Sequence, residues 1–131
     1  MRLSLFLIGG ALLAGAGTAQ AADRDPEAQL ARAIAGRVAG KPVDCIDQHD
    51  IRSTQIIDNT AIVYEGAGGT IYVNRPRSGA SSLRWGNILV TDTHSTQLCS
   101  IDVIHLIDSN SRMETGFVGL GPFVPYKKVP R

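Results

Sequence analysis

The chain has 131 residues, of which 13 are basic and 12 acidic, and its formal net charge at pH 7 is +1. Proteins that bind nucleic acid or anionic membranes through charge usually carry a clear excess of basic residues, so neither partner is expected. The length fits one small domain with a modest core.

Residues 1–21 have the pattern of a secretory signal peptide. Arg2 provides a short positive start, residues 3–17 are almost all apolar or small, and a small-x-small cleavage motif ends at Ala21. The apolar run is shorter than the roughly 20 residues of a membrane span. We therefore predict a periplasmic or secreted protein with no membrane span after cleavage. Its single domain would cover residues 22–131, with 12 basic and 12 acidic residues.

Both cysteines of the chain, Cys45 and Cys99, lie in the predicted mature domain. Compartments outside the cytoplasm allow disulfides to form and persist. A Cys45–Cys99 bridge would stabilise the fold by about 4 kcal/mol, because it restricts the unfolded chain. Asp47 and His49 follow Cys45 closely, but a bridged cysteine cannot act as a thiolate ligand or nucleophile.

Residues 25–40 are predicted to form an amphipathic helix. Asp25 suits the N-cap and Pro26 the first helical position. Gly40 would end the helix, whereas Gly36 would only weaken it by about 1 kcal/mol. Its large apolar residues recur every four positions, which gives a single stripe for packing on a sheet. The stripe consists of Leu30, Ile34 and Val38.

The rest of the chain alternates between β-rich runs and turn residues. The run at 98–108 is the strongest strand signal, and its residues 103–107 are apolar on both faces except for His105, which favours a central strand. Residues 66–69, Gly-Ala-Gly-Gly, are predicted as a hairpin turn, because a phosphate-binding loop would have to open a helix. The C-terminal residues 116–131 are expected to be extended, and their prolines disfavour a central strand. The predicted strands are 43–47, 53–58, 60–65, 70–74, 87–92 and 98–108.

These elements predict an α+β fold. One N-terminal helix would precede about five or six mainly antiparallel strands, in a small sheet or a barrel-like arrangement.

No catalytic or metal-binding motif stands out, so we expect no enzyme, no metal and no cofactor. The histidines lack the short spacings of zinc sites, and the nucleophile motif G-x-S-x-G is missing. His49 and His94 lie at similar distances from the two cysteines, so a bridge could bring them together. A small hydrolase with a site around them is one alternative. His105 lies inside an apolar run and is predicted to be a core or cross-strand histidine.

The loop predicted at 74–86 is the strongest candidate binding site. It holds three arginines within ten residues, with an aromatic residue on either side. Guanidinium groups next to aromatic rings suit carboxylates, phosphates or acidic sugars. The competing interpretation is a solvated loop whose arginines pair with acidic residues elsewhere. The candidate residues are Tyr72, Arg75, Arg77, Arg84 and Trp85.

Four segments resemble a family of small exported bacterial proteins of unknown function. The resemblance implies export and a compact disulfide-bonded domain, and it implies no established activity or catalytic residue. Relatives richer in cysteine have another cysteine after the Tyr-x-Asn segment. Residues 79–82 of this chain, Gly-Ala-Ser-Ser, have none there, so a second bridge is absent. The four segments are CID…IRSTQIID, IYVNRPRSG, LCSIDVIHLID and GLGPFVPYKK.

Together these observations favour a non-enzymatic binding or interaction protein of the cell envelope. Its partner would be an envelope component or another protein. A further alternative is a structural envelope protein or an inhibitor that presents an exposed sheet edge. An unpaired apolar edge over residues 117–126 would favour that role.

Overall fold

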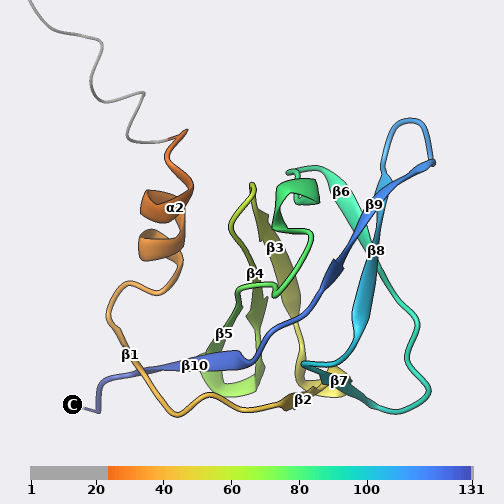
Figure 1. The fold of residues 1–131 in the computed structure, drawn as a ribbon. Coiled ribbons are helices and arrows are strands. Elements are labelled where there is room, and N and C mark those ends of the chain that lie inside the picture. Colours follow the sequence, from red (N-terminus) through yellow and green to blue (C-terminus); the bar gives the residue numbers. More distant parts are fainter. Residues whose placement is uncertain (1–23, 131) are drawn as a thin grey trace, which may run out of the picture.

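A computed structural model describes residues 24–130. The predicted signal peptide and its cleavage site lie outside these residues. The described part has one α-helix and ten strands in three antiparallel sheets (Figure 1). Helix α2 spans Pro26–Ala33, and three single turns of 3-10 helix follow: η1 Gln48–Asp50, η2 Ala67–Gly69 and η3 Ala80–Ser82. The strands are β1 Arg37–Ala39, β2 Cys45–Asp47, β3 Ser53–Ile57, β4 Ala61–Glu65, β5 Ile71–Asn74, β6 Asn87–Thr91, β7 Gln97–Cys99, β8 Val103–Asp108, β9 Glu114–Gly119 and β10 Phe123–Lys128.

The sequence predicted one helix and mainly antiparallel strands, which the structure confirms. The strands are more numerous than expected because the predicted run 98–108 is two strands, the end of the predicted helix forms β1, and the C-terminal part of the chain forms β9 and β10. None of the three sheets in residues 24–130 closes into a barrel. Residues 24–130 contain no helix that is long and apolar enough to cross a membrane.

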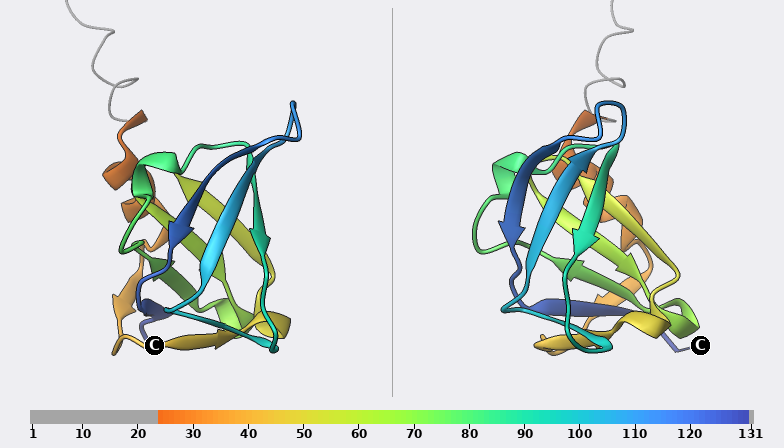
Figure 2. Two further views of the ribbon diagram at one scale, coloured as in Figure 1. Left: turned by 45° about the vertical axis from the view of Figure 1, so that its right-hand side comes forward. Right: turned by 90° about the vertical axis from the view of Figure 1, so that its right-hand side faces the viewer.

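The largest sheet has the strand order β1-β10-β5-β4-β3. Helix α2 covers one of its faces. The sheet β6-β8-β9 and the two-stranded ribbon β2-β7 cover the other face, so the domain has three layers (Figure 2).

Two hydrophobic cores separate these layers, since alternate residues of a strand point to opposite faces. The core under the helix contains Leu30, Ile57, Ala61, Val63, Ile71 and Val73. The core between the sheets contains Ile46, Ile56, Ile62, Tyr64, Leu83, Leu98, Ile104, Leu106, Val118, Leu120 and Phe123.

The helix is shorter than the predicted 25–40. It ends at Ala33, and Gly36 then adopts a φ of +75°, a left-handed conformation that favours glycine. The chain turns there and forms β1, which pairs with β10. Val38, placed by the sequence pattern in the helical stripe, is therefore on an edge strand and 60% exposed. The predicted start of the helix is confirmed, because Asp25 is the N-cap and its side chain accepts a hydrogen bond from the backbone N–H of Glu27.

The predicted strand 98–108 is two strands separated by a tight turn. Asp102 stabilises this turn, since its carboxylate accepts the backbone N–H of Cys99 at 2.7 Å. The second strand, β8, is the central strand of its sheet, as the two-sided apolar pattern predicted. The predicted hairpin around residues 66–69 is also confirmed, with β4 and β5 on either side of η2.

Strand β10 corrects the prediction that the C-terminal prolines avoid a central strand. It lies between β1 and β5. The carbonyl of Pro125 accepts the N–H of Gly40 at 2.6 Å, on the β1 side. The ring nitrogen of Pro125 points the same way, so no hydrogen bond to β5 is lost. Because β10 is paired on both sides, residues 123–126 do not form the unpaired edge that would favour an inhibitor or a structural envelope protein.

The predicted disulfide is confirmed. Cys45 and Cys99 lie opposite each other in β2 and β7, with their Cα atoms 4.0 Å apart, and their sulfur atoms are bonded. The bridge therefore fastens the ribbon at one end of the sandwich.

Candidate functional site

The segment 75–83, which we call the strap, lies along the outer edge of β9. The N–H of Arg77 donates to the carbonyl of Gly119 at 2.9 Å, and the N–H of Gly119 donates to the carbonyl of Ser78 at 3.1 Å. Most of the loop that the sequence offered as a recognition loop is thus a structural cover for a sheet edge.

Small residues let the strap approach β9 closely. Gly79 has a φ of +77°, and a Cβ atom there would lie 2.3 Å from the carbonyl oxygen of Phe117. On β9, a Cβ atom at Gly116 would meet the Ser82 hydroxyl at 2.8 Å. Leu83 anchors the end of the strap and is fully buried in the core between the sheets. The strap is therefore packed in place along its length.

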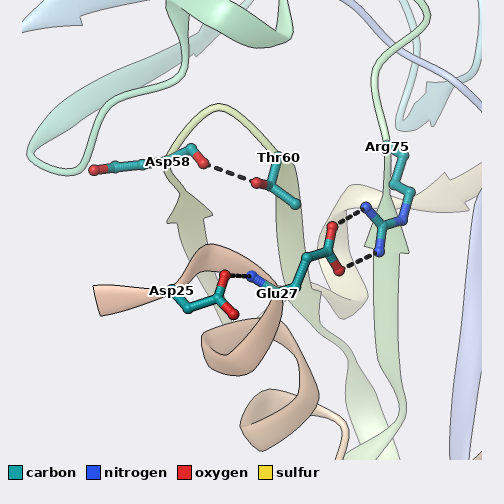
Figure 3. A network of polar contacts seen from close by, with 5 residues as sticks. All are labelled: Asp25, Glu27, Asp58, Thr60 and Arg75. Atoms are coloured by element: carbon teal, nitrogen blue, oxygen red, sulfur yellow. Dashed lines mark hydrogen bonds and ion pairs between the residues drawn. The ribbon is translucent and has the colours of Figure 1, made fainter. Parts of the chain in front are cut away.

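Arg75 pairs with the helix instead of facing a ligand (Figure 3). Its two terminal nitrogens donate to the two carboxylate oxygens of Glu27 at 2.9 and 3.0 Å. This contact lowers the pKa of Glu27 below its ordinary value and raises the pKa of Arg75, mainly through the hydrogen bonds. Both side chains stay more than half exposed, so the pair is a surface clasp between α2 and the strap.

The other predicted binding residues do not converge on Arg75. Arg84 donates to the side chain of Asn59 and to the carbonyls of Ser81 and Leu83, so it holds the end of the strap against the β3–β4 turn. The backbone of Trp85 is fixed by Asp58, which accepts its N–H at 2.5 Å, while its ring is 81% exposed.

Of the two remaining candidates, Tyr72 is partly buried against the core between the sheets, and Arg77 is exposed on the strap. A binding role for this set stays a prediction. The contact of Arg75 with Glu27 agrees with the competing interpretation, in which the arginines pair with acidic residues elsewhere. Arg84 also has partners within the protein, but they are an amide side chain and backbone carbonyls.

The structure brings the segments of His49 and His94 together at the disulfide end. Gln48 joins them, because its N–H donates to the carbonyl of Thr96 at 2.9 Å and its side-chain amide to Thr93 at 2.8 Å. Both histidines are exposed. Between residues 24 and 130 no group of three or more His, Cys, Asp or Glu side chains is placed to hold a metal ion.

His105 is a cross-strand histidine, as one of the two predicted placements proposed. Its Nδ1 lies 2.7 Å from a carboxylate oxygen of Glu114 on the neighbouring strand β9. Its ring also lies near that of Phe117, with centroids 6.5 Å apart. His105 therefore belongs to the surface of the β6-β8-β9 sheet and not to the core.

That surface, which we call the outer face, is apolar and uncovered. Val90, His105 and Phe117 lie side by side across β6, β8 and β9. Large hydrophobic side chains are seldom gathered on the open face of a sheet unless a partner covers them. The exposed apolar residues of the outer face are Ile88 at 40%, Val90 at 42%, Val103 at 43% and Phe117 at 60%.

Strand β6 is an edge strand of the β6-β8-β9 sheet. On its side of the domain, the space between this sheet and the large sheet is open. The edge strand of the large sheet, β3, is its neighbour across the opening, and Thr54 of β3 and Leu89 of β6 line two hollows between them. The first hollow, of about 440 Å³, extends to Trp85 and Asn87. The second, of about 220 Å³, extends to Thr91.

Tyr64 is one of the residues that line the second hollow. It is 4% exposed, and its hydroxyl has no hydrogen-bond partner among the residues described. A buried hydroxyl without a partner is costly, which makes this position unusual. Burial also raises the pKa of Tyr64, so the hydroxyl stays protonated and can donate.

Sequence reasoning missed both the outer face and the open side. A signal was present, because residues 88–90 and 103–107 are apolar on both sides of their strands. For residues 103–107 that pattern was interpreted as a sign of a central strand, and no uncovered face was inferred from it. No protein-family model, curated protein or solved structure matches the chain significantly.

Proposed function

We propose that the protein is an exported, non-enzymatic binding module of the cell envelope that binds another protein through the outer face of β6-β8-β9. The observation that carries the proposal is the row of Val90, His105 and Phe117, which nothing in the described structure covers. The inner face of the same sheet already supplies the core, so stability alone gives no reason for a second apolar face.

The character of this surface supports a protein partner. A broad apolar face with aromatic content fits the central part of a protein interface, whereas a charged polymer would need a concentrated basic surface. Two of the arginines offered for such a surface, Arg75 and Arg84, hold partners within the chain. Export is supported by the signal-peptide pattern, and the disulfide is consistent with it.

The test places a photo-crosslinking amino acid at Val90 in the full chain, expressed and exported in its own cells. A matched probe at Val129, which is also apolar and 57% exposed but lies beyond β10, serves as the control. We expect one protein to be captured from Val90 and not from Val129. Equal capture at both positions would contradict the proposal.

The captured protein is then purified and its affinity measured. Phe117→Lys should weaken binding by about tenfold or more, as for a residue near the centre of an interface. Val129→Lys should leave the affinity unchanged. An unchanged affinity for Phe117→Lys would remove the outer face from the interaction.

A further inference from the structure

Strand β6 is an edge strand that lacks the usual protection. Natural edge strands are blocked by charged side chains, prolines, bulges or a covering segment. The five residues of β6, Asn-Ile-Leu-Val-Thr, include no charge and no proline, and they pair with β8 without a register shift. On its other side, β6 has no strand partner in the described structure. The backbone groups of alternate residues, Asn87, Leu89 and Thr91, therefore point to the open side. The N–H of Asn87 donates there to the carbonyl of Arg84 at 3.2 Å, and Leu89 and Thr91 have no strand partner on that side.

The two hollows beside β6 follow the period of a strand. Asn87 and Leu89 line the first hollow, and Leu89 and Thr91 line the second. The hollows are thus displaced by two residues along β6. An extended chain places successive side chains of one face about 6.7 Å apart, which is the same two-residue step.

We propose that the partner contributes an extended peptide segment that pairs with β6 as a fourth strand and inserts two alternate side chains into these hollows. This inference rests on the proposed function and names the form of its partner. Backbone pairing of this kind supplies affinity, while the hollows for alternate side chains supply selectivity. The remaining side chains of the added strand would extend the outer face next to Ile88 and Val90.

The two hollows select different side chains. The first is the larger, with Ile56 and Leu89 in its wall and the exposed ring of Trp85 at its border, so it suits a large apolar or aromatic residue. The second is smaller, and three of its lining residues, Gln48, Thr54 and Thr91, are polar. It therefore suits a neutral polar side chain such as that of Asn, Gln, Ser or Thr.

Neither of the other neighbouring edges fits the segment as well. The strap already occupies the outer edge of β9. Strand β3 begins with three exposed polar residues, Ser53 to Gln55, and has no apolar outer face that an added strand could extend. The edge of β6 combines free backbone groups, an apolar face on one side and two hollows on the other.

The experiment selects ligands from a displayed library of random peptides of about ten residues, the upper length of an ordinary strand. The target is the oxidised mature protein. Selected peptides are synthesised, and their affinities are measured by fluorescence anisotropy. We expect enriched sequences with a large apolar residue and a neutral polar residue two positions apart.

Two variants of β3 locate the site. Thr54 is exposed and lines both hollows, so Thr54→Arg should fill them and weaken binding by about tenfold or more. Ser53→Arg introduces the same side chain on the neighbouring residue, whose side chain points to the opposite face. It should leave the affinity unchanged, and equal melting temperatures would show that both variants are folded. Equal affinities for the two variants would overturn the site.

Backbone methylation of the peptide tests strand pairing directly. Methyl groups on the nitrogens that face β6 should abolish binding, and methyl groups on the intervening nitrogens should be tolerated. A loss that does not alternate along the peptide would overturn the pairing. Thr91→Val, which removes a hydroxyl from the lining of the second hollow with little change in shape, should weaken binding only for peptides with the neutral polar residue, by about fivefold to tenfold, as for a lost hydrogen bond.

Further outcomes separate this inference from the proposed function. If the crosslinked partner loses affinity with Phe117→Lys but not with Thr54→Arg, the outer face binds a folded surface and the extended segment is wrong. If no peptide is enriched, the inference also fails. If sedimentation shows a dimer of the full mature chain that Thr54→Arg dissociates, the occupant of the edge is a second copy, which equally overturns the proposal.

Discussion

The two edge strands of the β6-β8-β9 sheet differ in whether another segment of the chain covers them. The outer edge of β9 is covered by the strap, whose backbone is bonded to Gly119 and whose Gly79 fits against Phe117. The outer edge of β6 carries no strap and has two hollows beside it. The chain covers one edge closely and leaves the other open, and this contrast is the basis of the binding role proposed for β6.

The largest expected effect comes from the disulfide, which closes the ribbon at one end of the open side. Replacing Cys45 and Cys99 together with alanine should lower the free energy of unfolding by about 4 kcal/mol, because the unfolded chain gains the freedom of the opened loop. Denaturant unfolding of the oxidised protein and the double variant measures the difference. A loss below about 1 kcal/mol would show that the bridge contributes little to this end of the sandwich.

The second effect tests the covered edge. Gly79→Ala should cost about 3 kcal/mol, because the new Cβ meets the Phe117 carbonyl and the backbone has a positive φ. Gly68→Ala is the control, since Gly68 has a similar φ of +72° but nothing within 4 Å of the new atom. It should cost about 1 kcal/mol. Equal losses in thermal unfolding would mean that the strap does not lie closely on β9.

The third effect concerns Tyr64, which lines the second hollow beside β6. Tyr64→Phe removes a buried hydroxyl that has no partner in residues 24–130, so stability should stay the same or rise by about 1 kcal/mol. Chemical denaturation of the two proteins provides the measurement. A clear loss of stability would show that the hydroxyl is already satisfied.

The smallest effect concerns the clasp between the strap and the helix. The pKa of Glu27 is lowered by Arg75, so the clasp stabilises the fold above the ordinary carboxyl pKa of 4.5 and this contribution is lost as the pH falls through the lowered value. A double-mutant cycle of Glu27→Gln and Arg75→Gln should give a small coupling energy at pH 7 and none at pH 2. A coupling that persists in acid would contradict the ion pair.

The sequence predicted local structure better than the surface. Helix capping at Asp25, the hairpin around residues 66–69 and the disulfide depend on local or compartment rules, and each is confirmed. The length of the helix and the placement of Pro125 depend on which strands become neighbours, which no local pattern encodes. The arginine loop was the hardest case, because the role of Arg75 is decided by Glu27, 48 residues away.

Residue-resolved amide hydrogen exchange of the isolated mature protein tests the contrast between the two edges most directly. The amide of Gly119, bonded to Ser78 of the strap, should exchange slowly, whereas the amides of Leu89 and Thr91 on the open side of β6 should exchange rapidly and become protected when a selected peptide binds. If all amides of β6 are protected without a peptide, or if the amide of Gly119 exchanges as rapidly as an open edge, the account of one closed and one open edge is contradicted.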